Sequence, residues 1–321
     1  MRTHKTKQFF FVLIKLSLVV GAFYFIYQKL TNNSELQFST FIAIITKTEL
    51  FSFKTISFLI LLSGFNWFFE ILKWKTLVST QEKISFKQAT NQTLGALTAS
   101  LITPNRIGEY GAKALYFAKS IRKRIMLVNF IGNLLQMTVT VVFGIIGLSL
   151  FVSKFSLNIN YLKLLKFIFI GFLLAALLVI GVRKSKGFTN WFQFKKLKTF
   201  ILNFQKSVLF FGFLLSVLRY LIFSFQFYFL LQCFQIEIDY FNSMMTITSM
   251  YLLASIIPTI FIFDVVIKGS VAVYLFSFLD INQLIILSII TLMWLLNFVL
   301  PSLMGSYFVL RFKPPKPEII S

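Results

Sequence analysis

Charged side chains that could bind a ligand occur within two segments of this chain: 85–118, which is only moderately apolar, and 243–278. These residues are Arg106, Glu109 and Lys113 in the first segment and Asp264 and Lys268 in the second. In both segments an acid precedes a lysine by four residues, so the two side chains share one helical face and can form an ion pair. Ionisable groups at membrane depth usually face a cavity, so we expect both sets to bind a charged ligand.

The chemistry that suits these residues is recognition of a phosphate. An arginine can bind a phosphate through two parallel hydrogen bonds, and helix starts freed by chain breaks offer main-chain N–H groups to the same anion. The breaks are expected at Pro104 and Gly108 in the first segment and at Pro258 and Gly269 in the second. The alternatives are a purely structural Arg106–Glu109 pair that locks the turn, and an Asp264–Lys268 pair exposed in an outer loop.

A further cation, Arg219, lies in the middle of the apolar run 208–234, with Gln226 seven residues later on the same helical face. Arg219 could compensate a lipid phosphate or Asp264, or it could pair with an acid for packing alone. Glu70 is expected to pair with Lys73 near the cytoplasmic face.

The composition identifies the setting as a lipid bilayer. Of the 321 residues, 57% are hydrophobic and 13% are charged, and the apolar residues form runs longer than a soluble core needs. The net charge of +22 comes from basic clusters between those runs, which the positive-inside rule explains without a nucleic-acid partner. One cysteine and one histidine exclude an internal disulfide, a Cys/His metal site and a Ser-His-Asp hydrolase.

The apolar runs predict full membrane spans near residues 9–28, 51–72, 125–152, 165–182, 208–234 and 284–310. If the basic clusters are cytoplasmic, both chain ends are cytoplasmic too. This topology closes only if 85–118 and 243–278 enter the membrane and return to their own sides. We therefore expect an all-α polytopic membrane protein with about six full spans and two re-entrant hairpins.

The two re-entrant segments resemble each other. One contains Ala-Ser-Leu-Ile-Thr-Pro at 99–104 and the other Ala-Ser-Ile-Ile-Pro-Thr at 254–259, each followed by the acid and lysine described above. Opposite entry sides predict an inverted repeat, with repeat one at 9–152 and repeat two at 163–310, in one transmembrane domain (1–321) with short basic tails. Such repeats are typical of transporters with a site near the midplane. The alternative is two ordinary helical hairpins that contain breaks.

The motif Pro104-x-Arg106-x-Gly108-Glu109 resembles the transmembrane region of the lysylphosphatidylglycerol synthase family, also called the flippase-like domain family. Pro258, Asp264 and Gly269 form a related pattern, although apolar residues at 260–263 and 265–266 stand where that family often has glycines. The resemblance covers roughly residues 10–310. The soluble aminoacyl-transferase domain of the best-known members has no counterpart here, so lysyl transfer is not expected.

The resemblance implies a lipid-handling protein of the bacterial inner membrane that translocates or binds a phospholipid or a polyprenyl-phosphate-linked lipid. Arg106, Arg219 and Lys268 would contact phosphate, while Glu109, Lys113 and Asp264 would complete the site. We expect no cofactor and no metal, and oligomeric state stays open. Whether the protein is an enzyme is also open: Glu109 or Asp264 could be the general base of a lipid transferase. A third hypothesis is a non-transporting partner of a cell-envelope enzyme.

Overall fold

The computed structural model describes residues 52–101, 103, 107–156, 199–200, 202–256 and 264–315, together with residues 13, 17, 20 and 24; at 264–267 it describes the main chain only. The chain divides into two compact units, Val152–Gln205 and the remainder. All helices discussed below begin in the larger unit. The predicted span at 165–182 lies outside the described residues, and so does the span at 9–28 apart from four single positions.

The first run of helices comprises α3 (Phe53–Val78), α4 (Phe86–Ser100), α5 (Gly108–Leu115) and α6 (Arg122–Lys154). Local sequence sets where two of them begin. The Ser52 side chain accepts the N–H of Thr55 at the start of α3. At the start of α4, Ser85 and Gln88 form a capping box, in which each side chain bonds the other residue's main-chain N–H.

The second run comprises α10 (Lys206–Cys233), α11 (Tyr240–Ile256), α12 (Asp264–Ser277) and a rod made of α13 (Gln283–Trp294), the π-helix η4 (Leu295–Val299) and α14 (Leu300–Arg311). Both runs thus have the order long, short, short, long. The short helices α4, α5, α11 and α12 have 15, 8, 17 and 14 residues, fewer than the roughly 20 that a full crossing needs. Helix α4 packs on α5, and α11 packs on α12.

Four helical stretches of the described chain are long and apolar enough to cross a membrane. They are Phe53–Val78, Arg122–Lys154, Lys206–Cys233 and Gln283–Arg311. These stretches confirm the spans predicted at 51–72, 125–152, 208–234 and 284–310, with ends shifted by a few residues. All regular secondary structure in the described ranges is helical. The protein is therefore a multi-pass, all-helical membrane protein.

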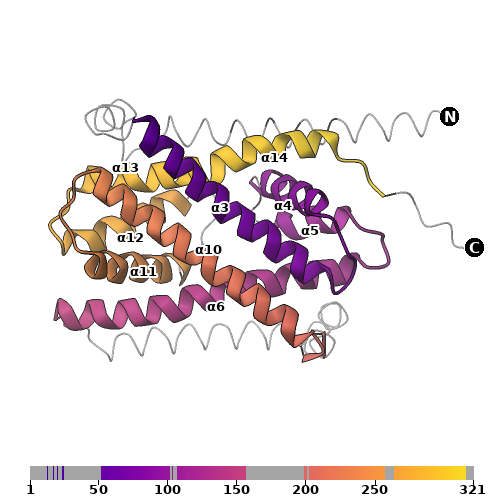
Figure 1. Ribbon diagram of the computed structural model, residues 1–321, viewed down its shortest axis with the longest axis horizontal. Helices are drawn as coiled ribbons and strands as arrows, with labels where there is room; N and C mark the ends of the chain where they lie inside the picture. Colours follow the sequence, from indigo (N-terminus) through magenta and orange to yellow (C-terminus); the bar gives the residue numbers. More distant parts are fainter. Residues whose placement is uncertain are drawn as a thin grey trace, which may run out of the picture. The chain divides into compact units, whose positions relative to one another are not determined.

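Helices from the two runs pack against each other: α3 lies beside α10, and α14 lies beside α4 (Figure 1). Glycine allows the closest approaches. A Cβ atom at Gly305 on α14 would collide with the main-chain oxygen of Leu94 and the hydroxyl of Thr98 on α4. On α6, a Cβ at Gly147 would collide with Thr248 on α11. Small residues at such contacts are typical of membrane helices, whose backbones pack closely without a hydrophobic driving force.

Candidate functional site

The centre of the candidate site is an ion pair between two membrane-spanning helices. Nη1 of Arg219 on α10 lies 2.7 Å from Oε2 of Glu70 on α3. The same carboxylate oxygen lies 2.7 Å from Nζ of Lys73. The side chains of Glu70 and Lys73 are almost fully buried, whereas that of Arg219 is 22% exposed. The predicted Glu70–Lys73 pair is confirmed, and Arg219 adds a second base to it.

Asparagine and glutamine side chains extend this ion pair into a buried hydrogen-bond network. Nε of Arg219 donates to Asn66 over 3.0 Å, and the Asn66 amide donates to Oδ1 of Asn297 over 2.8 Å. The Asn297 amide donates in turn to Oε1 of Gln226, and Gln226 donates to the hydroxyl of Ser63. The expectation that Arg219 and Gln226 face the same way is confirmed, because both reach α3. The network joins α3, α10 and η4.

A second buried ion pair forms around Lys113 on α5. Its Nζ lies 2.7 Å from Oε1 of Glu109, which confirms that the acid and the lysine four residues later meet. Lys113 also donates to Oδ1 of Asn129 on α6 over 2.8 Å and lies 4.4 Å from the centroid of the Trp74 ring. Trp74 is held in place because its indole N–H donates to Gln92 on α4.

The two ion pairs belong to one electrostatic cluster, because Lys113 lies close enough to Glu70 to interact with it. Among the described residues, the cluster contains three bases and two acids: Lys73, Lys113 and Arg219 against Glu70 and Glu109. Burying an ion costs several kcal/mol even after relaxation. The surplus positive charge therefore favours an anion beside Arg219, whose side chain is the most exposed in the cluster.

Gly108 allows the tight turn that leads into α5. Its N–H donates to the hydroxyl of Thr103 over 2.9 Å, and Thr103 donates to the main-chain oxygen of Ser100. A Cβ at Gly108 would lie 2.8 Å from the Thr103 methyl group, so a larger residue would push this turn apart. The glycine thus lets the start of α5 lie close to the end of α4, since a Cβ at Gly108 would also lie 3.3 Å from Cα of Ser100.

The other predicted site residues are described in part. Pro104, Arg106 and Pro258 lie outside the described residues, and so does the side chain of Asp264. Lys268 is half-buried, with Nζ 5.8 Å from the centroid of the Phe298 ring on η4. Gly269 is buried within α12. The predicted Asp264–Lys268 pair therefore stays a prediction.

Sequence reasoning missed most of the uncharged members of the site. Besides Gln226, five amide side chains contribute to it: Asn66, Gln92, Asn129, Gln136 and Asn297. None of these five amides is among the site residues expected from the sequence. The available signal was an amide within an otherwise apolar span, since such a group needs a partner inside the protein. Metal binding has no support within the described part of the chain, where no group of three His, Cys, Asp or Glu side chains is placed to hold an ion.

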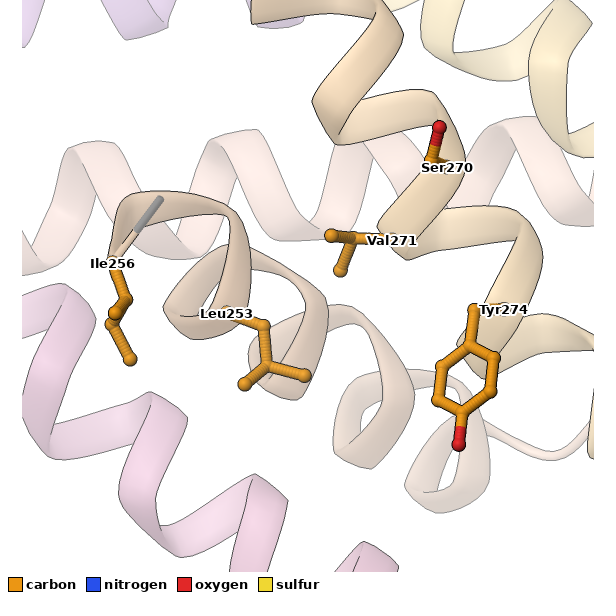
Figure 2. Close-up of a pocket in the computed structure, with 5 residues that line it drawn as sticks. All are labelled: Leu253, Ile256, Ser270, Val271 and Tyr274. Atoms are coloured by element: carbon orange, nitrogen blue, oxygen red, sulfur yellow. The ribbon is translucent and has the colours of Figure 1, made fainter. Parts of the chain in front are cut away.

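An apolar depression of about 360 Å³ lies between α11 and α12, apart from the charged cluster. Figure 2 shows its five lining residues, with Leu253 and Ile256 on α11 and Ser270, Val271 and Tyr274 on α12. Ile256 and Tyr274 are more than half exposed. Its lining is mostly apolar, so it does not provide the charges that a phosphate requires.

One comparison with known proteins gives a match. The family described as the lysylphosphatidylglycerol synthase TM region matches residues 12–305. No curated protein and no solved structure matches the chain. The matched region includes every residue of the charged cluster.

Proposed function

Because the chain belongs to the family of the lysylphosphatidylglycerol synthase transmembrane region, we propose that it binds a phosphate-bearing lipid headgroup in its polar interior and carries that lipid across the bilayer. The family itself indicates a membrane protein involved in lipid handling. Binding and transport of the lipid are what we propose in addition. The lipid would be a phospholipid or a polyprenyl-phosphate-linked lipid, and the membrane would be the bacterial inner membrane with both chain ends in the cytoplasm.

The observation that carries the proposal is the surplus base in the buried cluster. Glu70 is shared by Lys73 and Arg219, so one carboxylate serves two cations. A phosphate diester would supply the missing negative charge. The guanidinium of Arg219 already uses Nε and Nη1 for protein partners, and its remaining N–H donors could bind phosphate oxygens. Arg106, Lys113 and Lys268 would add positive charge, and Glu109 and Asp264 would orient these bases.

Transport needs two halves that can rearrange around the site, and an inverted repeat would supply them. Asn66 and Arg219 are separated by 153 residues and occupy matching places on α3 and α10. Each bonds an amide on the last span of the opposite half: Asn66 bonds Asn297, and Arg219 bonds Gln136. This crossed pairing is what two similar halves related by a twofold axis would produce.

Packing between the halves follows the same crossed pattern. The last span of the second half, through Gly305, meets α4, which is the second helix of the first half. The last span of the first half, through Gly144 and Gly147, meets α11, which is the second helix of the second half. These contacts support the inverted repeat, in which the charged cluster would lie between the two halves.

Reconstitution in liposomes tests the proposal. Vesicles would contain fluorescent phosphatidylglycerol or a fluorescent polyprenyl-phosphate lipid, and dithionite would report how fast inner-leaflet label becomes accessible. We expect wild type to accelerate this exchange and Arg219→Gln to slow it by about tenfold or more, as loss of a charged hydrogen bond predicts. Lys123→Gln is the matched control, because Lys123 is an exposed cation at the start of α6.

Two results would contradict the proposal. The claim of transport would be wrong if, for every lipid tested, inner-leaflet label became accessible to dithionite no faster with wild-type protein than in empty vesicles. If Lys123→Gln slowed exchange as much as Arg219→Gln, general surface charge rather than the buried cluster would control the rate. In the first case, turnover of a lipid acceptor and co-purification of envelope enzymes would test the transferase and partner-subunit alternatives.

A further inference from the structure

We propose that one face of α6 is the path along which the lipid headgroup moves, with Asn129, Asn133 and Gln136 as its polar track. This inference rests on the proposed function and adds the route to it. The three amides follow one another at spacings of four and three residues, so they share one face of the helix. Helix α6 is a candidate membrane span, in which such a row of polar groups is costly.

Each amide of the track contacts a different side chain on a neighbouring helix. Asn129 accepts a hydrogen bond from Lys113 over 2.8 Å, and Asn133 donates to the hydroxyl of Tyr110 over 2.9 Å. Gln136 accepts from Arg219 over 3.4 Å. The track therefore runs between α5 and α10 and connects two cations of the site, Lys113 and Arg219.

The face of α6 next to the track has a different character. Met126, Leu134 and Met137 are each more than 40% exposed, as expected of side chains that face lipid. Asn133 and Gln136 are half-buried, and Asn129 is 2% exposed. The amides thus point towards the protein interior, and Asn129 is the least accessible of the three.

Two features leave the track able to bind something other than protein. The amide nitrogen of Asn129 is buried and has no hydrogen-bond partner in the described part of the chain, although buried donors are almost always paired. Gln136 is held only by long bonds, to Arg219 and to the main-chain oxygen of Ser216, each 3.4 Å. A phosphate or glycerol oxygen would satisfy the first group, and the second could turn towards a ligand at little cost.

The electrostatics of the track suit movement as well as binding. Lys113 and Arg219 provide positive charge at its two ends. The neutral amides between them offer hydrogen bonds but do not hold a phosphate as tightly as a cation would. A phosphate would exchange one set of donors for the next along α6. The acyl chains would remain on the apolar side of the helix.

Photocrosslinking tests the route directly. A photoreactive amino acid would be placed at 133, 136, 134 or 137 in the full-length protein, in vesicles that contain phosphatidylglycerol labelled with ³²P in its phosphate. After irradiation and denaturation, phospholipase C would remove the labelled phosphate from any lipid attached through its diacylglycerol part. We expect phospholipase-resistant label at 133 and 136 and label that is released at 134 and 137.

Transport rates provide a second readout. Asn133→Leu and Gln136→Leu should each slow lipid exchange by about tenfold, since a leucine can bind no headgroup oxygen. Asn133→Gln, which keeps the amide, should lose less of the rate than Asn133→Leu, and Met137→Leu at an exposed apolar position should retain the wild-type rate. Monodisperse elution and an unchanged melting temperature would show that each variant is folded.

The outcomes separate this route from the proposed function. Wild-type transport without resistant label at 133 or 136 would overturn the route and leave the function standing. Resistant label at 134 and 137 equal to that at 133 and 136 would also overturn it. If wild type moved no lipid and bound none, the proposed function and the route would fall together.

Discussion

The indole nitrogen of Trp67 donates a hydrogen bond to the main-chain oxygen of Asn297 over 3.1 Å. In a regular α-helix this oxygen would accept the N–H of residue 301, but Pro301 has no N–H to donate. The helix also widens into the π-helix η4 at 295–299, between α13 and α14. The proline thus provides an acceptor for the first half of the protein. It also leaves the Asn297 side chain within the network that includes Asn66 and Gln226.

We predict that Trp67→Phe destabilises the protein by about 1–3 kcal/mol, because a buried carbonyl would lose its partner. Thermal unfolding in detergent or nanodiscs would measure the loss. The same substitution should cost less in a Pro301→Ala background, where the new N–H at 301 can bond the Asn297 oxygen. Equal costs in both backgrounds would show that Pro301 does not create this acceptor.

For the Glu70–Arg219 ion pair we predict that the single substitution Glu70→Gln lowers stability more than the double substitution does. Glu70→Gln leaves Lys73 and Arg219 buried without their shared carboxylate, a loss of about 3–5 kcal/mol. Adding Arg219→Gln should recover part of that stability, because one of the uncompensated charges is then removed. Chemical denaturation of the single and double variants measures the coupling, and additive losses would contradict it.

Two glycine substitutions should have opposite effects on stability: one at the contact between α14 and α4, and one at an open position on α3. Gly305→Ala should destabilise the protein, because the added Cβ collides with the main chain at Leu94. Gly64→Ala on α3 is the matched control: nothing lies within 4 Å of its added Cβ, and alanine favours a helix over glycine by up to about 1 kcal/mol. Melting temperatures that moved in the same direction would show that this packing is not tight.

Removing a buried hydroxyl that has no partner should not destabilise the protein, unlike most substitutions in the core. Among the described residues, no hydrogen-bond partner lies within reach of the hydroxyl of Tyr251 on α11. Tyr251→Phe should therefore leave stability unchanged or raise it by about 1 kcal/mol. Tyr116→Phe is the comparison, because its hydroxyl donates to the main-chain oxygen of Asn91 and its loss should destabilise the protein. A destabilised Tyr251→Phe would instead indicate a water molecule bound at this hydroxyl.

Much of the architecture could be predicted from the sequence because the bilayer imposes long-range rules on local composition. A span needs about 20 apolar residues wherever it occurs, so the described spans were found to within a few residues. The Glu109–Lys113 and Glu70–Lys73 pairs were predictable for a similar reason, since the geometry of one helix determines which side chains meet.

Contacts between distant helices depended on the tertiary structure. Nothing local to Arg219 indicates that it pairs with Glu70, or that Asn66 rather than another polar residue of α3 joins them. The amides of α6 could be recognised as polar groups in a span, but not assigned to Lys113, Tyr110 or Arg219.

The sequence by itself therefore determined that this chain is a helical membrane protein of a lipid-handling family, because hydrophobic runs and a short motif are properties of consecutive residues. Only the tertiary structure decided that Arg219, Glu70 and Lys113 form one cluster. The physical reason is that helix packing brings together residues far apart in the chain, and a buried charge takes whichever partner that packing places beside it.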